Sequence, residues 1–281
     1  MRKSLFLMFA AALPVFAQQS TAPQLNLPRP SPAATLKQTV GLTDITITYS
    51  RPAVKGRKIW GALVPYDKVW RTGANEATQI SFSDDVTING QPLSKGTYSL
   101  HTIPGQNEWT IIFNKVAKQW GSFSYDAAQD ALRVTAKPHG DEFNEWMTFS
   151  IPHMTPDSAT VEIKWEKLAV PFTVGTNTSQ KTLAEIRTAI AAAQPNDWRT
   201  PYRAAQYVVD NGLPLGDAAA WVDQSIKADE NIQNLFLKAR LQARQGDRTA
   251  ALATAEHAIA KAGPKDADEV NEIRKNMATW K

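Results

Sequence analysis

Apolar and polar residues alternate along much of the chain between residues 35 and 174. In the segment DITITYS, for example, Ile45, Ile47 and Tyr49 share one face, and residues 161–167 alternate in the same way. Successive side chains of a β-strand point to opposite faces of the sheet, so a period of two predicts half-buried strands. We therefore expect residues 35–174 to form a mainly β domain.

Turn signals separate these expected strands. Asn89 and Gly90 lie between two short apolar runs, and a type I′ turn needs positive φ at both central positions, so the pair predicts a tight hairpin. Residues 108–114 are apolar on both faces, which favours a strand with neighbours on both sides. With roughly eight to ten short strands in all, the expected architecture is an antiparallel β-sandwich or a jelly-roll-like fold.

After Gly175 the hydrophobic period changes from two to about 3.6, which predicts helices over residues 175–281. Residues 231–264 resemble a tetratricopeptide helix pair, a repeat that places small residues where its helices meet. The residues at such positions are Ala239, Gly246, Ala251 and Ala258. A second, degraded pair begins near Trp198. Two such pairs are fewer than the roughly three repeats that a free solenoid needs, so we expect the helices to pack on the β domain or on another chain.

The first 34 residues follow neither period. A basic start, Arg2 and Lys3, precedes a short apolar run, and a small-residue cleavage pattern ends at Ala17. This arrangement predicts a signal peptide over residues 1–17, followed by an extended, Pro-rich linker over residues 18–34. We expect an exported protein, periplasmic or extracellular, with no membrane span once the signal is removed.

Composition narrows the possible chemistry. The 281 residues contain 31 Lys and Arg against 27 Asp and Glu, and this small basic excess does not predict a nucleic-acid partner. The chain has no Cys, which excludes disulfides, thiolate metal sites and a Cys nucleophile. Its four His residues show no metal-binding spacing, and no nucleotide-binding or serine-hydrolase motif occurs, so we expect no metal and no cofactor.

The most polar motif is WRTGANEAT, residues 70–78. If residues 76–82 form a strand, Glu76 shares the inward face with Ile80 and Phe82 and would need nearby donors. The motif and the segment just before it supply candidate partners, namely Arg51, Lys55, Arg57, Arg71, Asn75 and Thr78. Two interpretations remain open: a polar pocket that binds a ligand, or an internal ion pair that holds a loop over the core.

Other candidates lie farther along the chain. His101 is expected to be a surface or hydrogen-bonded residue, with a general base beside Glu76 as the alternative. Asn114, Trp120 and Tyr125 fall in one connection between strands, either as ligand contacts or as a loop packed by its own aromatic side chains. Of the nine Trp residues, Trp165 and Trp221 are expected to be structural. If two of the others flank the Arg71 to Thr78 loop, a glycan or an aromatic ligand becomes plausible; the candidates are Trp60, Trp70, Trp109, Trp120 and Trp146.

Several separate blocks resemble the bacterial family known as domain of unknown function 2911. They are YSRPAVKGRKIWGALVPYDKVWRTGANEAT, LSKGTYSLHTIPGQNEWTIIFNK, QWGSFSYD and DALRV, and the resemblance spans Leu36 to Val174. It implies an exported protein with a β-rich domain, often followed by a helical or tetratricopeptide-like tail. The family has no established activity, so the resemblance strengthens the pocket interpretation without naming a reaction.

Three functional hypotheses follow. The first is a binding module that holds a small polar or anionic ligand, or a glycan, at the Arg71 to Thr78 loop, with the helical tail for protein contacts. The second is a hydrolase or lyase of cell-envelope material that uses Glu76 as acid or base, with His101 as a further catalytic candidate. The third is a ligand-free scaffold that works through its helices.

Overall fold

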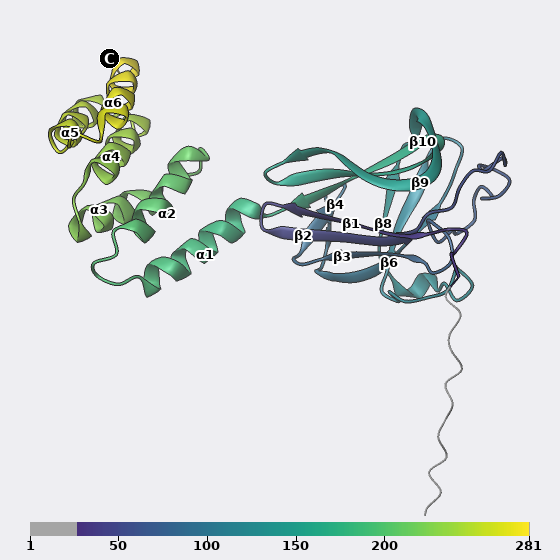
Figure 1. The fold of residues 1–281 in the computed structure, drawn as a ribbon. Coiled ribbons are helices and arrows are strands. Elements are labelled where there is room, and N and C mark those ends of the chain that lie inside the picture. Colours follow the sequence, from purple (N-terminus) through teal and green to yellow (C-terminus); the bar gives the residue numbers. More distant parts are fainter. Residues whose placement is uncertain (1–26, 281) are drawn as a thin grey trace, which may run out of the picture.

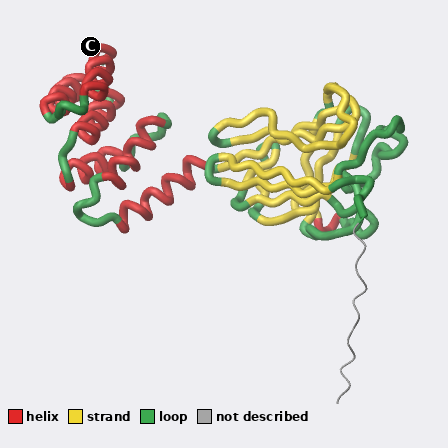
Figure 2. Tube along the Cα trace, viewed as in Figure 1, coloured by secondary structure: helices red, strands yellow, loops and turns green. Residues whose placement is uncertain are grey.

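The structure is a computed structural model that describes residues 27–280. The expected signal peptide and most of the expected linker lie outside these residues. Strands fill the first part of the described chain and six helices the second, so the predicted order of a β domain and an all-α region is confirmed (Figures 1 and 2).

The larger sheet has six strands in the order β1-β2-β3-β6-β7-β8, and each neighbouring pair is antiparallel. Its strands are β1 (Ala33–Val40), β2 (Thr43–Ser50), β3 (Thr78–Phe82), β6 (Gly96–Ile103), β7 (Trp109–Asn114) and β8 (Asp130–Ala136). Strand β7 lies between β6 and β8, as its apolar sequence predicts. A short 3-10 helix, η1 (Ala127–Gln129), precedes β8.

The smaller sheet has four antiparallel strands in the order β5-β4-β10-β9. They are β4 (Val86–Ile88), β5 (Gln91–Leu93), β9 (His139–Thr155) and β10 (Ser158–Thr176). Ile88 pairs with Gln91 across Asn89 and Gly90, whose φ angles are 48° and 82°, so the predicted two-residue hairpin is confirmed.

The two sheets enclose one hydrophobic core. Its members come from alternate positions of both sheets, for example Ile45 and Ile47 of β2 and Val161, Ile163 and Trp165 of β10, all at most 1% exposed. These are the positions that the period of two assigns to the inner face. Sheet packing of this kind buries apolar side chains on one face of each sheet and leaves the other face for polar ones.

The helices follow without a break from β10. They are α1 (Thr178–Ala192), α2 (Arg199–Asp210), α3 (Ala218–Ala228), α4 (Ile232–Arg244), α5 (Arg248–Ala260) and α6 (Ala267–Thr279). They pack as pairs around two apolar clusters. None of the helices within residues 27–280 is long and apolar enough to cross a membrane.

Helix α1 connects the helical region to the sheets. Lys181 near its start bonds to Asp84 at 2.8 Å and to the Leu42 carbonyl oxygen at 3.2 Å. Helices α2 to α6 lie away from both sheets in Figure 1. The expectation that the helices would pack on the β domain is therefore not met by the described chain.

Candidate functional site

Residues 51–77 form a long connection between β2 and β3 at the end of the sandwich away from the helices, where Figure 2 shows most of the loops. Backbone bonds fasten it to both sheets: the Val54 N–H donates to Glu145 at 2.8 Å, and Trp70 and Thr102 exchange two bonds. Long loops held on a rigid scaffold are common positions for binding residues.

The WRTGANEAT motif makes a tight turn within this loop. Thr72 and Asn75 have φ angles of 52° and 59°. The Trp70 indole N–H donates to the Gly73 carbonyl oxygen at 3.2 Å, and the Thr78 hydroxyl donates to the Thr72 carbonyl oxygen at 2.7 Å. A Cβ at Gly73 would lie 3.0 Å from the Thr78 hydroxyl oxygen, so the turn leaves no room for a side chain there.

A cavity of about 380 Å³ opens beside this turn. Its lining combines the two guanidinium groups of Arg57 and Arg71 with an amide, a backbone turn and several apolar side chains. The lining residues are Ser31, Pro52, Arg57, Leu63, Val64, Trp70, Arg71, Gly73, Ala74, Asn75 and Trp165. None of them is acidic, so the lining holds positive charge that no carboxylate of its own balances.

Arg71 is the residue that distinguishes this cavity. Its side chain is partly buried, and within residues 27–280 its guanidinium makes no ion pair and its buried Nε atom has no hydrogen-bond partner. Burial lowers the pKa of Arg71, although a guanidinium stays protonated at neutral pH. A partly buried cation without a partner is costly, which makes it a marker for a missing anion.

The other polar groups of the lining are partly occupied. Arg57 is exposed, and it donates from Nε to the Val54 carbonyl oxygen at 3.0 Å and from Nη2 to the Ala53 carbonyl oxygen. The Asn75 amide donates to the Ser31 carbonyl oxygen at 3.2 Å. These bonds fix the lining in place and leave Arg71 as the group with the most unused donors.

Four indoles pack beneath the cavity. The rings of Trp70 and Trp165 stack at 6.0 Å with an interplanar angle of 18°, and Trp60 and Trp109 meet them edge to face. The Nε1 atom of Trp165 is buried without a hydrogen-bond partner. Trp165 is thus a second residue of the lining with an unused donor. A buried N–H is costly to leave unpaired.

The family model "Protein of unknown function (DUF2911)" matches residues 31–174, just over half of the chain. The chain belongs to this family. The DUF2911 match begins at Ser31, which lines the cavity, and ends within β10. No curated protein and no solved structure matches the chain.

Glu76 corrects one prediction about the DUF2911 domain. The regular strand begins at Thr78, and positive φ at Asn75 breaks the alternation on which the inward placement of Glu76 depended. Its side chain is 47% exposed and accepts both its bonds at 3.0 Å from Arg29, a residue of the expected linker rather than any of the proposed partners. Its own backbone N–H and then Arg29 lower the pKa of Glu76.

Three more residues predicted at the ligand, Arg51, Lys55 and Thr78, do not line the cavity. The Arg51 Nε donates to the Met147 carbonyl oxygen at 2.9 Å, Lys55 is exposed at a turn with a φ of 48°, and Thr78 is fully buried. Of the residues expected at the ligand, the DUF2911 cavity brings together Arg57, Arg71 and Asn75.

The remaining candidates form a separate cluster on the outer face of the larger sheet. The Tyr125 hydroxyl donates to Asp130 at 2.6 Å and accepts from Arg133 at 2.8 Å, while Arg133 also donates to Asp130 at 2.7 Å. The buried Asn114 amide donates to Asp130 as well, at 2.8 Å. Burial is the largest cause that raises the pKa of Tyr125, to about 12. The carboxylate of Asp130, which accepts a hydrogen bond from the Tyr125 hydroxyl, raises it further.

His101 lies under the same loop, and the surface placement expected for it is wrong. It is fully buried, its ring nitrogens bond to no side chain within the described chain, and the Gly121 backbone is the polar group that acts on the ring. Its ring packs 5.1 Å from that of Tyr125, and burial lowers the pKa of His101 to about 4. Trp120, in contrast, is 59% exposed and pairs with Glu76 only through the backbone. His101 is therefore closed off from solvent, whereas the Glu76 side chain is about half exposed.

Sequence reasoning missed Ser31, Trp70 and Trp165 as cavity residues. Ser31 lies in the expected linker, and Trp165 is almost a hundred residues from Arg71, so only the folded topology brings them together. Trp70, beside Arg71 in the motif, was one of several Trp residues left unassigned. Of the five Trp residues considered for flanking the loop, Trp70 lines the cavity, and the second indole of the lining is Trp165, which the sequence assigns to the core.

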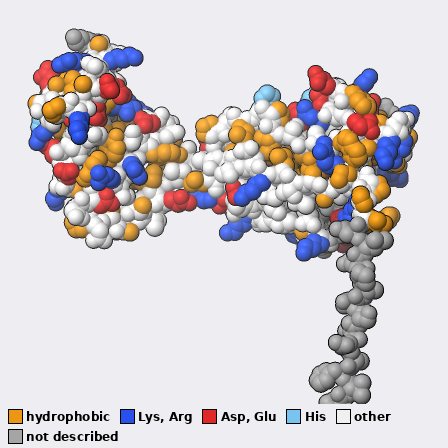
Figure 3. Space-filling model, in the orientation of Figure 1, with side chains coloured by type: hydrophobic (Ala, Val, Ile, Leu, Met, Phe, Trp, Pro, Cys, Tyr) orange, Lys and Arg blue, Asp and Glu red, His pale blue; other side chains and the backbone are white. Residues whose placement is uncertain are grey.

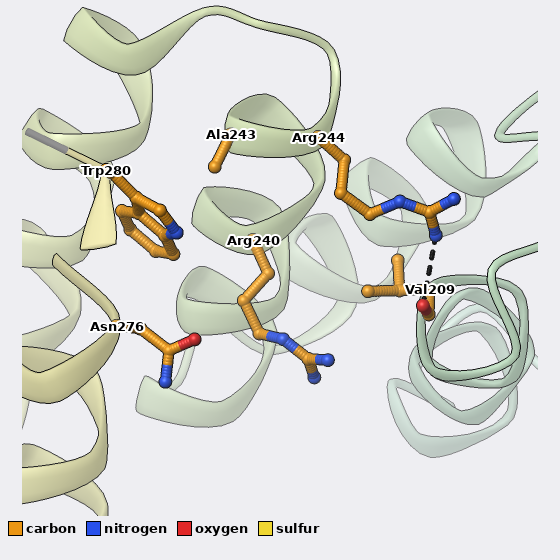
Figure 4. Close-up of a pocket in the computed structure, with 6 residues that line it drawn as sticks. All are labelled: Val209, Arg240, Ala243, Arg244, Asn276 and Trp280. Carbon is orange, nitrogen blue, oxygen red and sulfur yellow. Dashed lines mark hydrogen bonds between the residues drawn. The ribbon is translucent and has the colours of Figure 1, made fainter.

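A second cavity, of about 310 Å³, lies among the helices (Figure 4). It also contains two guanidinium groups, but both are occupied. Arg240 pairs with Asp210 at 2.7 Å, and Arg244 donates to the carbonyl oxygens of Val209 and Leu213 at 3.0 and 3.2 Å. Within residues 27–280, moreover, no group of three or more His, Asp or Glu side chains is arranged to hold a metal ion.

Proposed function

We propose that the DUF2911 domain is a binding module that holds a small anion in the cavity beside the Arg71 turn. The observation that carries this proposal is the unpartnered, partly buried guanidinium of Arg71 in a lining without acidic residues. Planar Arg donors match the oxygens of a carboxylate or phosphate, and the fixed turn holds these donors before the ligand arrives.

The size of the cavity supports the same function. Its volume of about 380 Å³ falls within the usual range for small-molecule sites. Figure 3 shows several Lys and Arg side chains at the end of the β-region away from the helices, with Asp and Glu side chains among them. We further propose that the protein is exported and works outside the cytoplasm.

The two other hypotheses have less support. As an acid or base, Glu76 would need a cleft, yet it does not line the cavity and its pKa is lowered rather than raised. A scaffold that works through its helices would expose apolar side chains there. In the described chain, however, the exposed large hydrophobic residues all lie before residue 155.

The helical region contributes a secondary proposal. Ala239, Ala251 and Ala258 are fully buried where helices α4, α5 and α6 meet, which is what a tetratricopeptide-like pair needs for close packing. We propose that these paired helices provide a rigid surface for protein contacts, separate from the ligand cavity.

The test is isothermal titration of the full chain with acetate, inorganic phosphate and neutral glycerol at low salt. Binding of at least one anion, with no binding of glycerol, is expected. Replacing Arg71 by Gln should weaken that binding by about ten-fold or more, because the charge-assisted bonds to the ligand are lost.

Lys58→Gln is the matched control. It removes the same unit of charge from an exposed residue of the same loop that does not line the cavity. It should change anion affinity by less than about two-fold, since exposed charges are screened. Equal losses in both variants would show a general charge effect and would overturn the proposal.

A further inference from the structure

Resting on the proposed function, we infer that the cavity takes a monocarboxylate on a compact apolar body, such as an aromatic or alicyclic acid. A sugar or a free inorganic anion fits the lining less well. The inference rests on three features of the lining: its unbalanced charge, its apolar side chains and the concentration of its free donors on Arg71.

One partly buried cation, Arg71, carries the unbalanced positive charge of the lining. Arg71 is partly buried and keeps its donors free, whereas Arg57 is exposed to water and already gives Nε and Nη2 to backbone carbonyls. A singly charged anion neutralises one such group. A dianion would bring a second negative charge into a site where only one guanidinium is removed from water.

Six of the lining residues are apolar, although polar atoms make up more of the surface that the lining exposes. Pro52, Leu63 and Val64 come from the loop, and the buried indoles of Trp70 and Trp165 lie behind them. Leu63 is 45% exposed and would be covered by a ligand in the cavity. Burial of apolar ligand surface against such residues strengthens binding.

A sugar would lack partners in this lining. Each buried hydroxyl needs a donor or acceptor, and an unmet one weakens binding. The Asn75 amide already donates one bond to the Ser31 carbonyl oxygen, and the free donors of the lining are concentrated on Arg71, where they suit one carboxylate better than several separate hydroxyls. Inorganic phosphate has a different difficulty, because an ion of that size would leave most of a 380 Å³ cavity and its apolar lining unfilled.

The experiment separates the charged head of the ligand from its body. The full chain is titrated with benzoate, acetate, benzyl alcohol, glucuronate and inorganic phosphate under identical conditions. Benzoate should bind about ten-fold or more tightly than acetate, which has the same head but no ring, and than benzyl alcohol, which has the ring but no charge. Glucuronate and phosphate should bind more weakly than benzoate.

Two variants locate these contributions. Arg71→Met should weaken benzoate binding by about ten-fold or more and leave benzyl alcohol unchanged. Leu63→Ser should weaken benzoate by about three-fold and leave acetate unchanged, because only the ring contacts that position. Both residues are partly or substantially exposed, so both variants are expected to fold.

The outcomes distinguish this inference from the proposed function. If acetate or phosphate binds through Arg71 but benzoate binds no more tightly than acetate, the proposed anion-binding function stands. The inference that the ligand has an apolar body is then wrong. If glucuronate binds more tightly than benzoate, the ligand is a sugar acid and the inference is likewise wrong. If no anion binds the wild-type chain, both proposals fail.

Discussion

Two polar clusters of the β domain look alike in sequence and differ in structure. In the Tyr125, Asp130 and Arg133 cluster, a cation, a carboxylate and a hydroxyl bond to one another at 2.6 to 2.8 Å. At the cavity, Arg71 meets no carboxylate and keeps a buried donor unpaired. The first cluster satisfies its own bonds, whereas the second leaves donors for a molecule from outside.

The contrast shows that unused donors alone do not mark a binding site. His101, beside the Tyr125 cluster, also bonds to no side chain within the described chain, but it is fully buried and its low pKa keeps it neutral. Arg71 is charged and lines a cavity that a ligand can enter. Charge together with access separates a binding residue from a tolerated defect of the fold.

The largest expected effect concerns His101 and acid. Its pKa of about 4 in the folded protein lies below the ordinary value of 6.5, so between these two pH values the unfolded chain binds a proton that the folded chain does not. Stability should therefore fall as the pH drops from about 6.5 to 4, by roughly 2 kcal/mol at pH 5 relative to pH 8. Urea denaturation at a series of pH values measures this loss.

His101→Gln supplies the comparison, because other groups of the protein also bind protons in acid. The variant is expected to be less stable than wild type at pH 8, since it changes a fully buried side chain. Between pH 8 and pH 5, however, it should lose about 2 kcal/mol less than wild type does. Parallel losses in the two proteins would mean that folded His101 accepts its proton at an ordinary pKa.

The next prediction compares the two arginines directly. Arg71→Met removes an unpaired, partly buried cation and should leave ligand-free stability unchanged or raise it by up to about 1 kcal/mol. Arg133→Met leaves Asp130, whose side chain is 8% exposed, with one bond fewer and should cost about 1 kcal/mol or more. Denaturation midpoints in urea at neutral pH provide both values. Loss of stability in Arg71→Met would indicate that its guanidinium has a structural partner.

The sequence predicted the fold well because its periodicity reports which face of each element is buried. The Asn89-Gly90 turn, the inner position of β7 and the buried alternation of β10 all follow from local pattern. The site was predicted only in part. Arg57, Arg71 and Asn75 lie in one motif-rich loop, whereas Trp165 joins them through the pairing of distant strands.

The error at Glu76 has a local physical cause. Alternation of side chains holds only while the backbone stays extended, and the positive φ angles of Thr72 and Asn75 turn the chain just before β3 begins. The side-chain pattern alone did not fix where the strand starts. A shift of two residues was enough to turn a supposed core carboxylate into a half-exposed one.

The smallest expected effect is that of Glu76→Gln. Glu76 and Arg29 are 47% and 54% exposed, so the loss of their ion pair should cost less than about 1 kcal/mol and the difference should shrink at high salt. The exchanged pair Arg29→Glu with Glu76→Arg should restore wild-type stability. Since Glu76 does not line the cavity, acetate affinity should stay within about two-fold of wild type. Loss of anion binding in Glu76→Gln, with the fold intact, would show that Glu76 belongs to the binding site. The distinction between Arg71, which has unused donors, and Glu76, which is paired with Arg29, would then be wrong.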